Sequence, residues 1–147
     1  MIRALVLVLA VAACAPSGET PKQESEAAQL AAPTPEDVSV RITAGQNGQT
    51  GHVRVNQRFA VERVGVRTAG YAWTPAQMPD FLIRAGEASG NTRAEQNQPG
   101  FTGGNHWEVL MFTATAPGTG ELVLEQRRPW ETEEAPADVF RVTIAAQ

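Results

Sequence analysis

The stretch HWEVLMFTATAPGTGELVLEQR, residues 106–127, indicates the fold more clearly than any other part of the sequence. Residues 106–116 are mostly apolar on both faces, which is typical of a strand buried between other layers. Residues 117–120, PGTG, are turn formers, and residues 121–127 return as a second strand. Two strands joined by a tight turn therefore form the predicted centre of a β-sheet domain.

Six further segments have the character of strands, with turn-forming residues between them. They are residues 38–43, 52–55, 58–64, a segment beginning at Tyr71–Trp73, 81–89 and 138–146. Asn56-Gln57 joins the second and third of these segments and predicts either a hairpin or one bent strand. With no convincing helical stretch after residue 36, about eight short strands predict an all-β domain, an antiparallel sandwich or barrel.

The N-terminus has the parts of a secretory signal, namely Arg3, the apolar run Ala4–Val11 and small residues that end at Cys14. The apolar run is too short to cross a bilayer as a helix, which needs about 20 residues. Val11-Ala12-Ala13-Cys14 resembles the lipobox of bacterial lipoproteins, in which the cysteine is lipidated after cleavage. We therefore expect residues 1–14 to be a lipoprotein signal, with an ordinary signal peptide as the alternative.

The same resemblance implies a location. Cys14 is the only cysteine, so the protein would contact the membrane through a lipid anchor only. Ala15 does not resemble the aspartate that retains lipoproteins in the inner membrane, which favours the outer membrane, facing the periplasm. Residues 15–36 are rich in Ala, Pro, Glu and Gln and predict a flexible tether, which leaves residues 37–147 as the folded domain.

Composition and residue types argue against several functions. A net charge of −4 and the absence of a basic run argue against nucleic-acid binding. His52 and His106 lack metal-ligand neighbours at useful spacing, and Ser39 and Ser89 lack the context of a catalytic nucleophile. We expect no enzyme activity, no metal and no cofactor, and a hydrolase is the least favoured interpretation.

Three segments between strands carry the functional signal. They are VRTAGYAW (66–73), GFTGG (100–104) and RRPW (127–130). Trp130 lies beside Pro129 among charged residues, a setting that a buried tryptophan rarely has, so we expect its indole to contact another protein. The alternative is a tryptophan folded back over the sheet. Trp73 and Trp107 each begin a strand, and we expect them to support the core or the loops.

In this order the three segments resemble the loops of chagasin-like inhibitors of papain-type cysteine peptidases, over roughly residues 37–147. The resemblance implies an immunoglobulin-like β-sandwich, a monomer, whose three loops occlude the catalytic cleft of a papain-like cysteine peptidase. The family motifs are N-P-T-T-G, G-x-G-G and R-P-W. An envelope lipoprotein that binds a partner through the same fold without inhibition is the alternative function.

The motifs match this sequence to different degrees. Arg128-Pro129-Trp130 matches the third motif in full, and Gly103-Gly104 matches the end of the second, with Phe101 in place of a glycine. In the first motif Thr68 and Gly70 match, whereas Val66, Arg67 and Ala69 depart from it. The resemblance implies that Thr68 lies over the catalytic cysteine. The expected peptidase-binding residues are Arg67, Thr68, Ala69, Gly70, Thr102, Gly103, Gly104, Arg128, Pro129 and Trp130.

Overall fold

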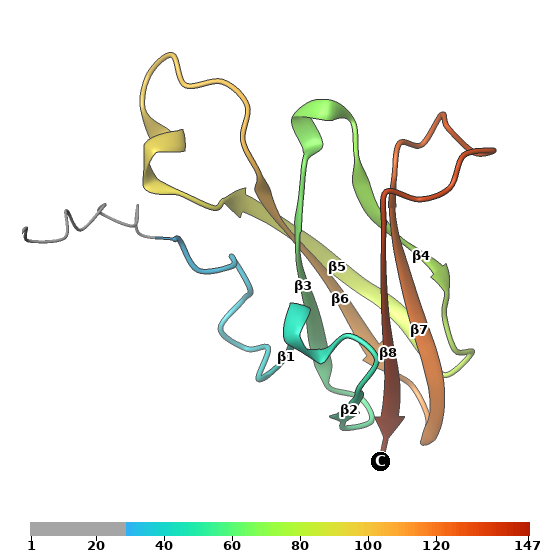
Figure 1. The fold of residues 1–147 in the computed structure, drawn as a ribbon. Coiled ribbons are helices and arrows are strands. Elements are labelled where there is room, and N and C mark those ends of the chain that lie inside the picture. The colour runs from blue at the N-terminus through green and yellow to red at the C-terminus, as the bar shows by residue number, and fades with distance from the viewer. Residues whose placement is uncertain (1–28) are drawn as a thin grey trace, which may run out of the picture.

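The computed structural model describes residues 29–147, which form two four-stranded sheets packed face to face (Figure 1). One sheet has the strand order β1-β3-β6-β5, and the other has the order β2-β8-β7-β4. The strands are β1 (Val40–Ile42), β2 (Thr50–Val53), β3 (Arg58–Gly65), β4 (Ala72–Gln77), β5 (Leu82–Asn91), β6 (His106–Ala114), β7 (Gly118–Arg127) and β8 (Asp138–Ala146). The predicted eight-stranded, immunoglobulin-like sandwich is confirmed.

Two of the strand pairings differ from the antiparallel expectation. β1 pairs with β3 and β2 pairs with β8 in parallel, whereas the remaining pairings are antiparallel. β2 and β3 lie in different sheets, so the chain at Asn56-Gln57 crosses between sheets and is not a hairpin. Asn56 has a φ of 64° and donates its backbone N–H to the Ala114 carbonyl, which fixes this crossing.

The core lies between the two sheets and consists of inward-facing residues contributed by all eight strands. Its largest fully buried side chains include Phe59, Phe112 and Phe140, and the Phe59 and Phe112 rings stack with centroids 5.7 Å apart. Burying each such ring contributes about 1.5–3 kcal/mol. Trp73 is 3% exposed and donates its indole N–H to the Val64 carbonyl, so its predicted supporting role in the core is confirmed.

Residues 29–36 differ from the predicted flexible tether, because they pack on the outer face of the β1-β3-β6-β5 sheet. Leu30 donates its N–H to the Thr92 carbonyl, and the Trp107 indole donates to the Leu30 carbonyl at 2.8 Å. Thr34 is 8% exposed and donates its hydroxyl to Glu62. The domain therefore begins before residue 37, while residues 15–28 of the predicted tether and the predicted signal lie outside the described residues.

The helices of residues 29–147 are single 3-10 turns: η1 (Ala44–Gln46), η2 (Arg67–Ala69) and η3 (Ala94–Asn97). None of the helices in this part of the chain is long and apolar enough to cross a membrane. Two of the turns, η2 and η3, lie in loops at the upper end of the sandwich, and the C-terminus lies at the lower end (Figure 1).

Candidate functional site

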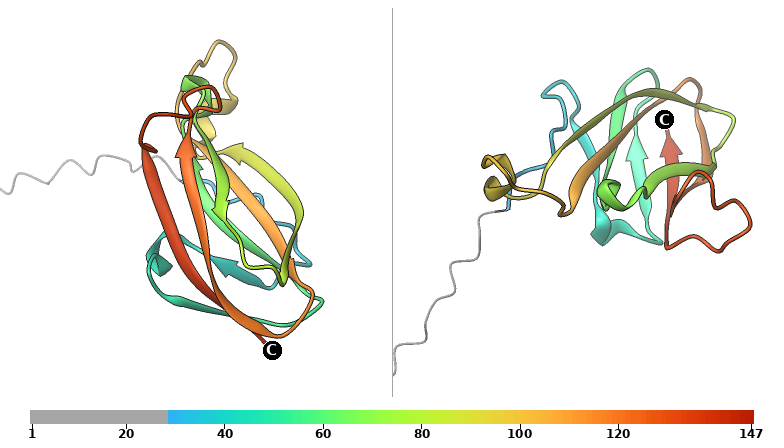
Figure 2. Two further views of the ribbon diagram at one scale, coloured as in Figure 1. Left: turned by 90° about the vertical axis from the view of Figure 1, so that its right-hand side faces the viewer. Right: turned by 90° about the horizontal axis from the view of Figure 1, so that it is seen from above.

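The strand register places three loops at one end of the sandwich. Gly65, the last residue of β3, and Asn91, the last of β5, both pair with His106, the first residue of β6. Arg127 ends β7 and pairs with Ala72, where β4 begins. We name the three connections the first loop (66–71), the second loop (92–105) and the third loop (128–137). Seen from above, they lie in a row with the first loop in the middle (Figure 2).

The first loop is a single 3-10 turn. Ala69 donates its N–H to the Val66 carbonyl at 3.0 Å, and Gly70 donates to the Arg67 carbonyl at 2.9 Å. Gly70 ends the turn with a φ of 84°, a conformation that strains any residue with a β-carbon. Thr68 and Ala69 are exposed at the outermost part of this turn.

Arg128 joins the third loop to the first loop. Its Nε donates to the Ala69 carbonyl at 2.8 Å, and its guanidinium lies 4.6 Å from the centre of the Tyr71 ring. A further nitrogen of the same side chain donates to Glu131 at 2.8 Å, and this bond raises the pKa of the Arg128 guanidinium. The fork of donors on one arginine thus connects both loops, which a lysine could not do in the same way.

Trp130 also contacts the first loop, although its indole is 69% exposed. A β-carbon built on Gly70 would lie 2.4 Å from Cη2 of Trp130, so the indole rests against the bare backbone of Gly70. The predicted exposure of Trp130 is therefore observed, and one edge of its ring lies against the first loop. Through Arg128 and Trp130 the first and third loops form one unit, which we call the joined loops.

Arg127 holds the third loop from the side of the sheet. Its Nε and one terminal nitrogen donate to the Glu125 carboxylate, and the other terminal nitrogen donates to the Glu134 carbonyl at 3.0 Å. The residue is the last of β7, so its side chain connects the start of the third loop to Glu134 near the loop's end. This support residue was not singled out in the sequence.

The second loop is built separately. The Gln96 side-chain oxygen accepts the N–H groups of Thr92 at 2.8 Å and of Arg93 at 2.9 Å, while its amide donates to the Asn105 carbonyl at 2.9 Å. One glutamine therefore ties the two ends of the loop together. Within residues 29–147, no hydrogen bond joins the second loop to the joined loops.

Glycines shape the outer part of the second loop. Gly100, Gly103 and Gly104 have φ values of 83°, 85° and 90°, so each adopts the left-handed conformation. A β-carbon on Gly104 would lie 3.6 Å from the Phe101 ring and 2.9 Å from the Gln96 amide nitrogen. The requirement for glycine at positions 103 and 104 thus already follows from the fold of the loop itself.

A buried carboxyl group lies beneath the first loop. Glu108 accepts the backbone N–H of Trp73 at 3.1 Å, and its other oxygen has no partner among the described residues. Burial raises the pKa of Glu108, while the Trp73 N–H and the nearby Arg67 and His106 act in the opposite direction. A cavity of about 280 Å³ adjoins it, lined also by Glu87 and Ser89.

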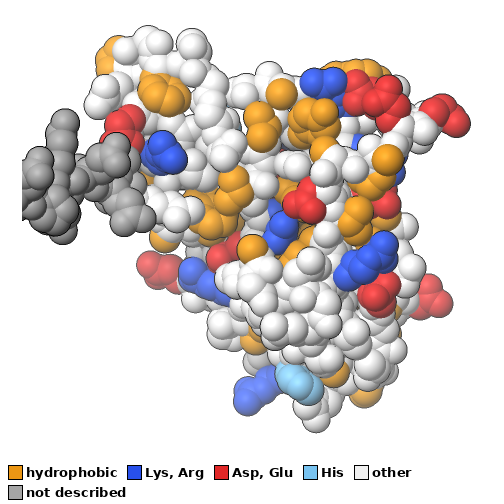
Figure 3. Space-filling model, in the orientation of Figure 1, with side chains coloured by type: hydrophobic (Ala, Val, Ile, Leu, Met, Phe, Trp, Pro, Cys, Tyr) orange, Lys and Arg blue, Asp and Glu red, His pale blue; other side chains and the backbone are white. Residues whose placement is uncertain are grey.

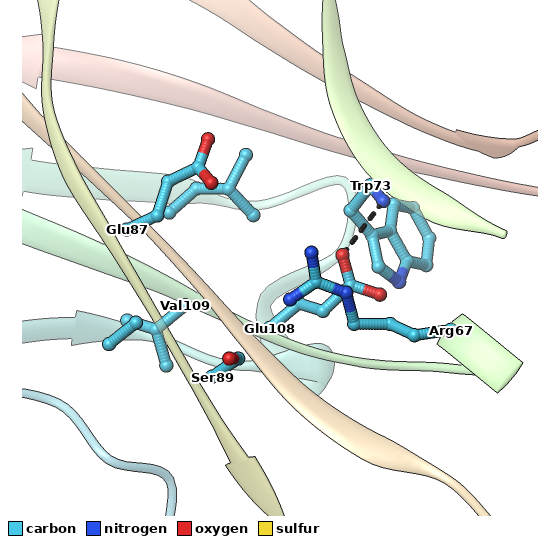
Figure 4. A pocket seen from close by; sticks show the side chains of 8 residues that line it. Arg67, Trp73, Glu87, Ser89, Glu108 and Val109 are labelled. Atoms are coloured by element: carbon cyan, nitrogen blue, oxygen red, sulfur yellow. Dashed lines mark hydrogen bonds between the residues drawn. The ribbon is translucent and has the colours of Figure 1, made fainter. Parts of the chain in front are cut away.

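Arg67 belongs to this cavity as much as to the first loop. Its side chain extends from η2 back toward Glu108 rather than away from the domain (Figure 4). The guanidinium therefore lies near the Glu108 carboxylate, and its charge acts to lower the pKa of that group. This position makes Arg67 a counter-charge for the base of the loop, a role that the sequence motif did not indicate.

Arg63 forms a second charged position below the loops. Its guanidinium lies between the rings of Trp73, at 4.5 Å, and Phe140, at 4.4 Å, and within 3.5 Å of the Asp138 carboxylate. Burial lowers the pKa of Arg63, and Asp138 opposes that shift. Period-2 counting from Phe59 along β3 places Arg63 on the inner face, so the sequence did hold a signal for it.

The structure brings the predicted site residues together in two groups. Seven of them lie in the joined loops, namely Arg67, Thr68, Ala69, Gly70, Arg128, Pro129 and Trp130. The other three, Thr102, Gly103 and Gly104, lie in the second loop at the same end. Residues 29–147 contain no group of three or more His, Cys, Asp or Glu placed to hold a metal ion.

A β-sandwich that presents three preformed loops at one end is the architecture of a protein that binds through loops. Residues 52–144 match the family described as chagasin family peptidase inhibitor I42, and this match spans more than half of the chain. The chain belongs to the chagasin family of peptidase inhibitors. This membership supports the prediction that the protein is not an enzyme. No curated protein sequence matches the chain significantly.

Two solved structures of low sequence identity share the fold. The cysteine protease inhibitor EhICP2 from Entamoeba histolytica aligns with a TM-score of 0.61 at 19% identity, over 74% of this chain and 95% of its own. The solution structure of amebosin aligns with a TM-score of 0.57 at 24% identity, over 74% of this chain and 97% of its own. Both likenesses extend over nearly the whole length of the compared proteins.

Proposed function

We propose that this protein inhibits papain-type cysteine peptidases by placing its three loops across the catalytic cleft. Membership in a peptidase inhibitor family supports the inhibitory role, and the relative EhICP2 is described as a cysteine protease inhibitor. The observation that carries the proposal is the fixed position of Trp130, exposed yet held on Gly70 of the first loop. A rigid exposed indole beside an arginine has the composition of an interface hot spot.

The backbone of the first loop explains how a peptidase could be blocked without cleaving its inhibitor. A cysteine peptidase attacks a carbonyl carbon and stabilises the resulting oxyanion with hydrogen bonds. Around Thr68, however, the Arg67 carbonyl already accepts Gly70 N–H, and the Ala69 carbonyl accepts Arg128 Nε. With Thr68 over the catalytic sulfur, the loop offers a tight turn rather than the extended peptide that a substrate provides.

Preorganisation explains how such loops could bind tightly. Ordering loops on binding consumes part of the free energy of association, and loops that are already fixed avoid this cost. Arg128 and Trp130 fix the joined loops, and Gln96 fixes the second loop. All three loops begin and end in strands of the sandwich, so they need little rearrangement before they contact a target.

The experiment is a titration of a papain-type peptidase with the full chain, in which residual activity gives the inhibition constant. Trp130→Ala should weaken inhibition about thirtyfold, corresponding to about 2 kcal/mol for a hot-spot aromatic. The matched control is Ile83→Ala, since Ile83 is 51% exposed near the opposite end of β5. Thermal melting should change little in either variant.

The result that would contradict the proposal is a folded wild type that inhibits none of several papain-type peptidases. That outcome would favour the alternative, an envelope protein that binds a partner without inhibition. One observation favours this alternative: Val66, Arg67 and Ala69 depart from the family motif, and the Arg67 side chain extends toward Glu108 of its own chain. The triple variant Val66→Asn, Arg67→Pro and Ala69→Thr, which restores the motif, would then confer inhibition on an inactive wild type.

We further propose that the protein is anchored to the cell envelope through a lipid on Cys14, in the outer membrane facing the periplasm. The support is the Val11–Cys14 sequence at the end of the signal-like segment. In cells that express Cys14→Ser, the protein should move from the membrane fraction to the soluble fraction. If the variant stays with the membranes, the anchor is not at Cys14.

A further inference from the structure

Exposed apolar side chains mark all three loops. The large hydrophobic residues exposed among residues 29–147 are Val66, Met78, Ile83, Phe101 and Trp130. Val66, Phe101 and Trp130 lie one in each loop, at the same end of the sandwich. A partner that contacted all three loops would therefore meet an exposed apolar side chain on each of them. Phe101 is the contribution of the second loop, and its ring is 46% exposed.

The backbone around Phe101 fixes where this ring lies. Phe101 donates its N–H to the Gln98 carbonyl at 3.2 Å, and its ring lies against Gly104. Gly100 and Gly103, both left-handed, bound the Phe101-Thr102 pair on either side. The ring therefore has its position before any partner arrives, which lowers the ordering cost of using it as a contact.

The second loop is independent of the joined loops. Its ends are tied by Gln96, whose partners are Thr92, Arg93 and Asn105, all within the same loop. A change at position 101 would therefore alter one contact with a partner and leave Trp130 and η2 in place. A residue with this independence can select between partners without changing the mode of binding.

The charge of the second loop indicates what kind of partner surface it fits. Arg93 and Glu95 lie near the start of the second loop, but its remaining residues 96–105 contain no Lys, Arg, Asp, Glu or His. The third loop and its base hold more charged residues, namely Arg127, Arg128, Glu131, Glu133 and Glu134. In Figure 3 the second loop, at the upper left, carries apolar and uncharged groups at its outer end, and charged groups gather over the third loop at the upper right. Phe101 thus faces outward from an uncharged surface.

We infer that Phe101 is a specificity-determining residue, which selects papain-type peptidases with an apolar side chain on the rim of the cleft beside the second loop. The inference rests on the proposed function and deepens it. A charged side chain at that place on the peptidase would lose water against the ring without gaining a partner, so binding would be weaker. Trp130 then contributes affinity for all papain-type peptidases, and Phe101 determines the selectivity among them.

The test compares inhibition constants of the full chain for four papain-type peptidases. Two have an apolar side chain, and two a charged side chain, on the rim of the cleft that would lie beside the second loop. Phe101→Ala should weaken inhibition of the apolar-rim enzymes at least about fivefold and of the charged-rim enzymes less than about twofold. Phe101→Leu should retain most of the selectivity, and Ile83→Ala is the control for losing an exposed apolar side chain. The selectivity ratio should not change between low and high salt, because no charge is involved.

If the wild type inhibits the enzymes, this inference would be overturned by either of two results for Phe101→Ala: an equal loss of inhibition against all four enzymes, or no loss against any of them. Equal losses together with a lowered melting temperature would assign Phe101 to support of the second loop instead. A folded wild type that inhibits none of the four enzymes would overturn the proposed function, and this inference with it.

Discussion

Two exposed aromatic rings each lie on a glycine, but the two contacts connect different parts of the chain. Trp130 of the third loop rests on Gly70 of the first loop, where a β-carbon would lie 2.4 Å from the ring. Phe101 lies near Gly104 of its own loop, where a β-carbon would be 3.6 Å from the ring. The first contact connects two loops, whereas the second lies within a loop that no hydrogen bond of residues 29–147 joins to the joined loops. An aromatic ring beside a glycine therefore connects the first and third loops at Trp130, but at Phe101 it connects only residues of the second loop.

The largest effect is expected from Gly70→Ala. The new methyl group would lie 2.4 Å from the Trp130 ring, and the φ of 84° would strain the alanine, so both the indole and η2 would be displaced. We expect inhibition to weaken at least about thirtyfold. The measurement is the inhibition constant, accompanied by thermal melting.

Gly48→Ala is the matched control for Gly70→Ala. Gly48 also has a left-handed φ, 75°, but a β-carbon there would meet nothing within 4 Å. It should lose stability from backbone strain alone and keep its inhibition constant. If both variants weaken inhibition equally, the contact between Trp130 and Gly70 has no special role.

A smaller effect is expected from Arg128→Lys. Lysine keeps the charge but lacks the planar fork that connects the Ala69 carbonyl, Tyr71 and Glu131, so the joined loops should loosen. We expect about a fivefold loss of inhibition.

Double variants would test directly whether the second loop is energetically independent of the joined loops. Arg128→Lys and Trp130→Ala act on one unit, so their combined loss should fall short of the product of the single losses. Arg128→Lys and Phe101→Ala act on separate units, and their losses should multiply within about twofold. Strong coupling between Arg128 and Phe101 would show that the second loop is not independent.

Gln96→Ala should have a more modest effect, confined to the second loop. Removing the side chain leaves the N–H groups of Thr92 and Arg93 and the Asn105 carbonyl without their partner. The free energy of unfolding should fall by about 1 kcal/mol, and inhibition should weaken about threefold. In this background Phe101→Ala should cost less than in the wild type, whereas Trp130→Ala should cost the same. The readout is chemical denaturation together with inhibition constants.

The smallest effect is a dependence of stability on pH through Glu108. Because burial raises the pKa of its carboxyl in the folded state, the folded protein holds this proton more tightly than the unfolded chain. This contribution to stability is therefore present at low pH and is lost as the pH rises above 4.5, the ordinary value, through the raised pKa. Glu108→Gln keeps an oxygen for the Trp73 N–H but cannot titrate. Melting temperatures across this range should fall more steeply for the wild type than for the variant, and parallel curves would contradict the assignment.

The sequence predicted most of the strands because period-2 alternation is a local signal. Residues 138–146 were predicted as a strand and form β8, and residues 106–116 contain β6. The parallel pairings of β1 with β3 and of β2 with β8 were missed, since alternation says nothing about which strand a segment pairs with or in which direction. The packing of residues 29–36 on the β1-β3-β6-β5 sheet was missed because it depends on the sheet face beneath them and not on their own composition.

The loops of the site were found by their motifs, but their connections were not. Arg128 and Ala69 are 59 residues apart in the sequence, and nothing near either residue indicates the hydrogen bond between them. Gln96 is one of several polar residues in a loop without periodicity, so its role could not be distinguished from that of its neighbours. The sequence thus located the surface, and the contacts that make it rigid required the fold.

The place where the described chain begins has a practical consequence for handling the protein. The hydrogen bond from Leu30 to Thr92 and the bridge between Gln29 and Arg93 hold this start at the base of the second loop, while the C-terminus lies at the opposite end (Figure 1). A tag, fluorophore or solid support attached upstream of residue 29 would therefore be connected to the domain beside Thr92 and Arg93, at the base of the second loop. The same attachment after Gln147 would point the loops into solution. If Cys14 carries a lipid, residues 15–28 can span at most about 50 Å, which sets the largest possible distance between the bilayer and the start of the described chain at Gln29.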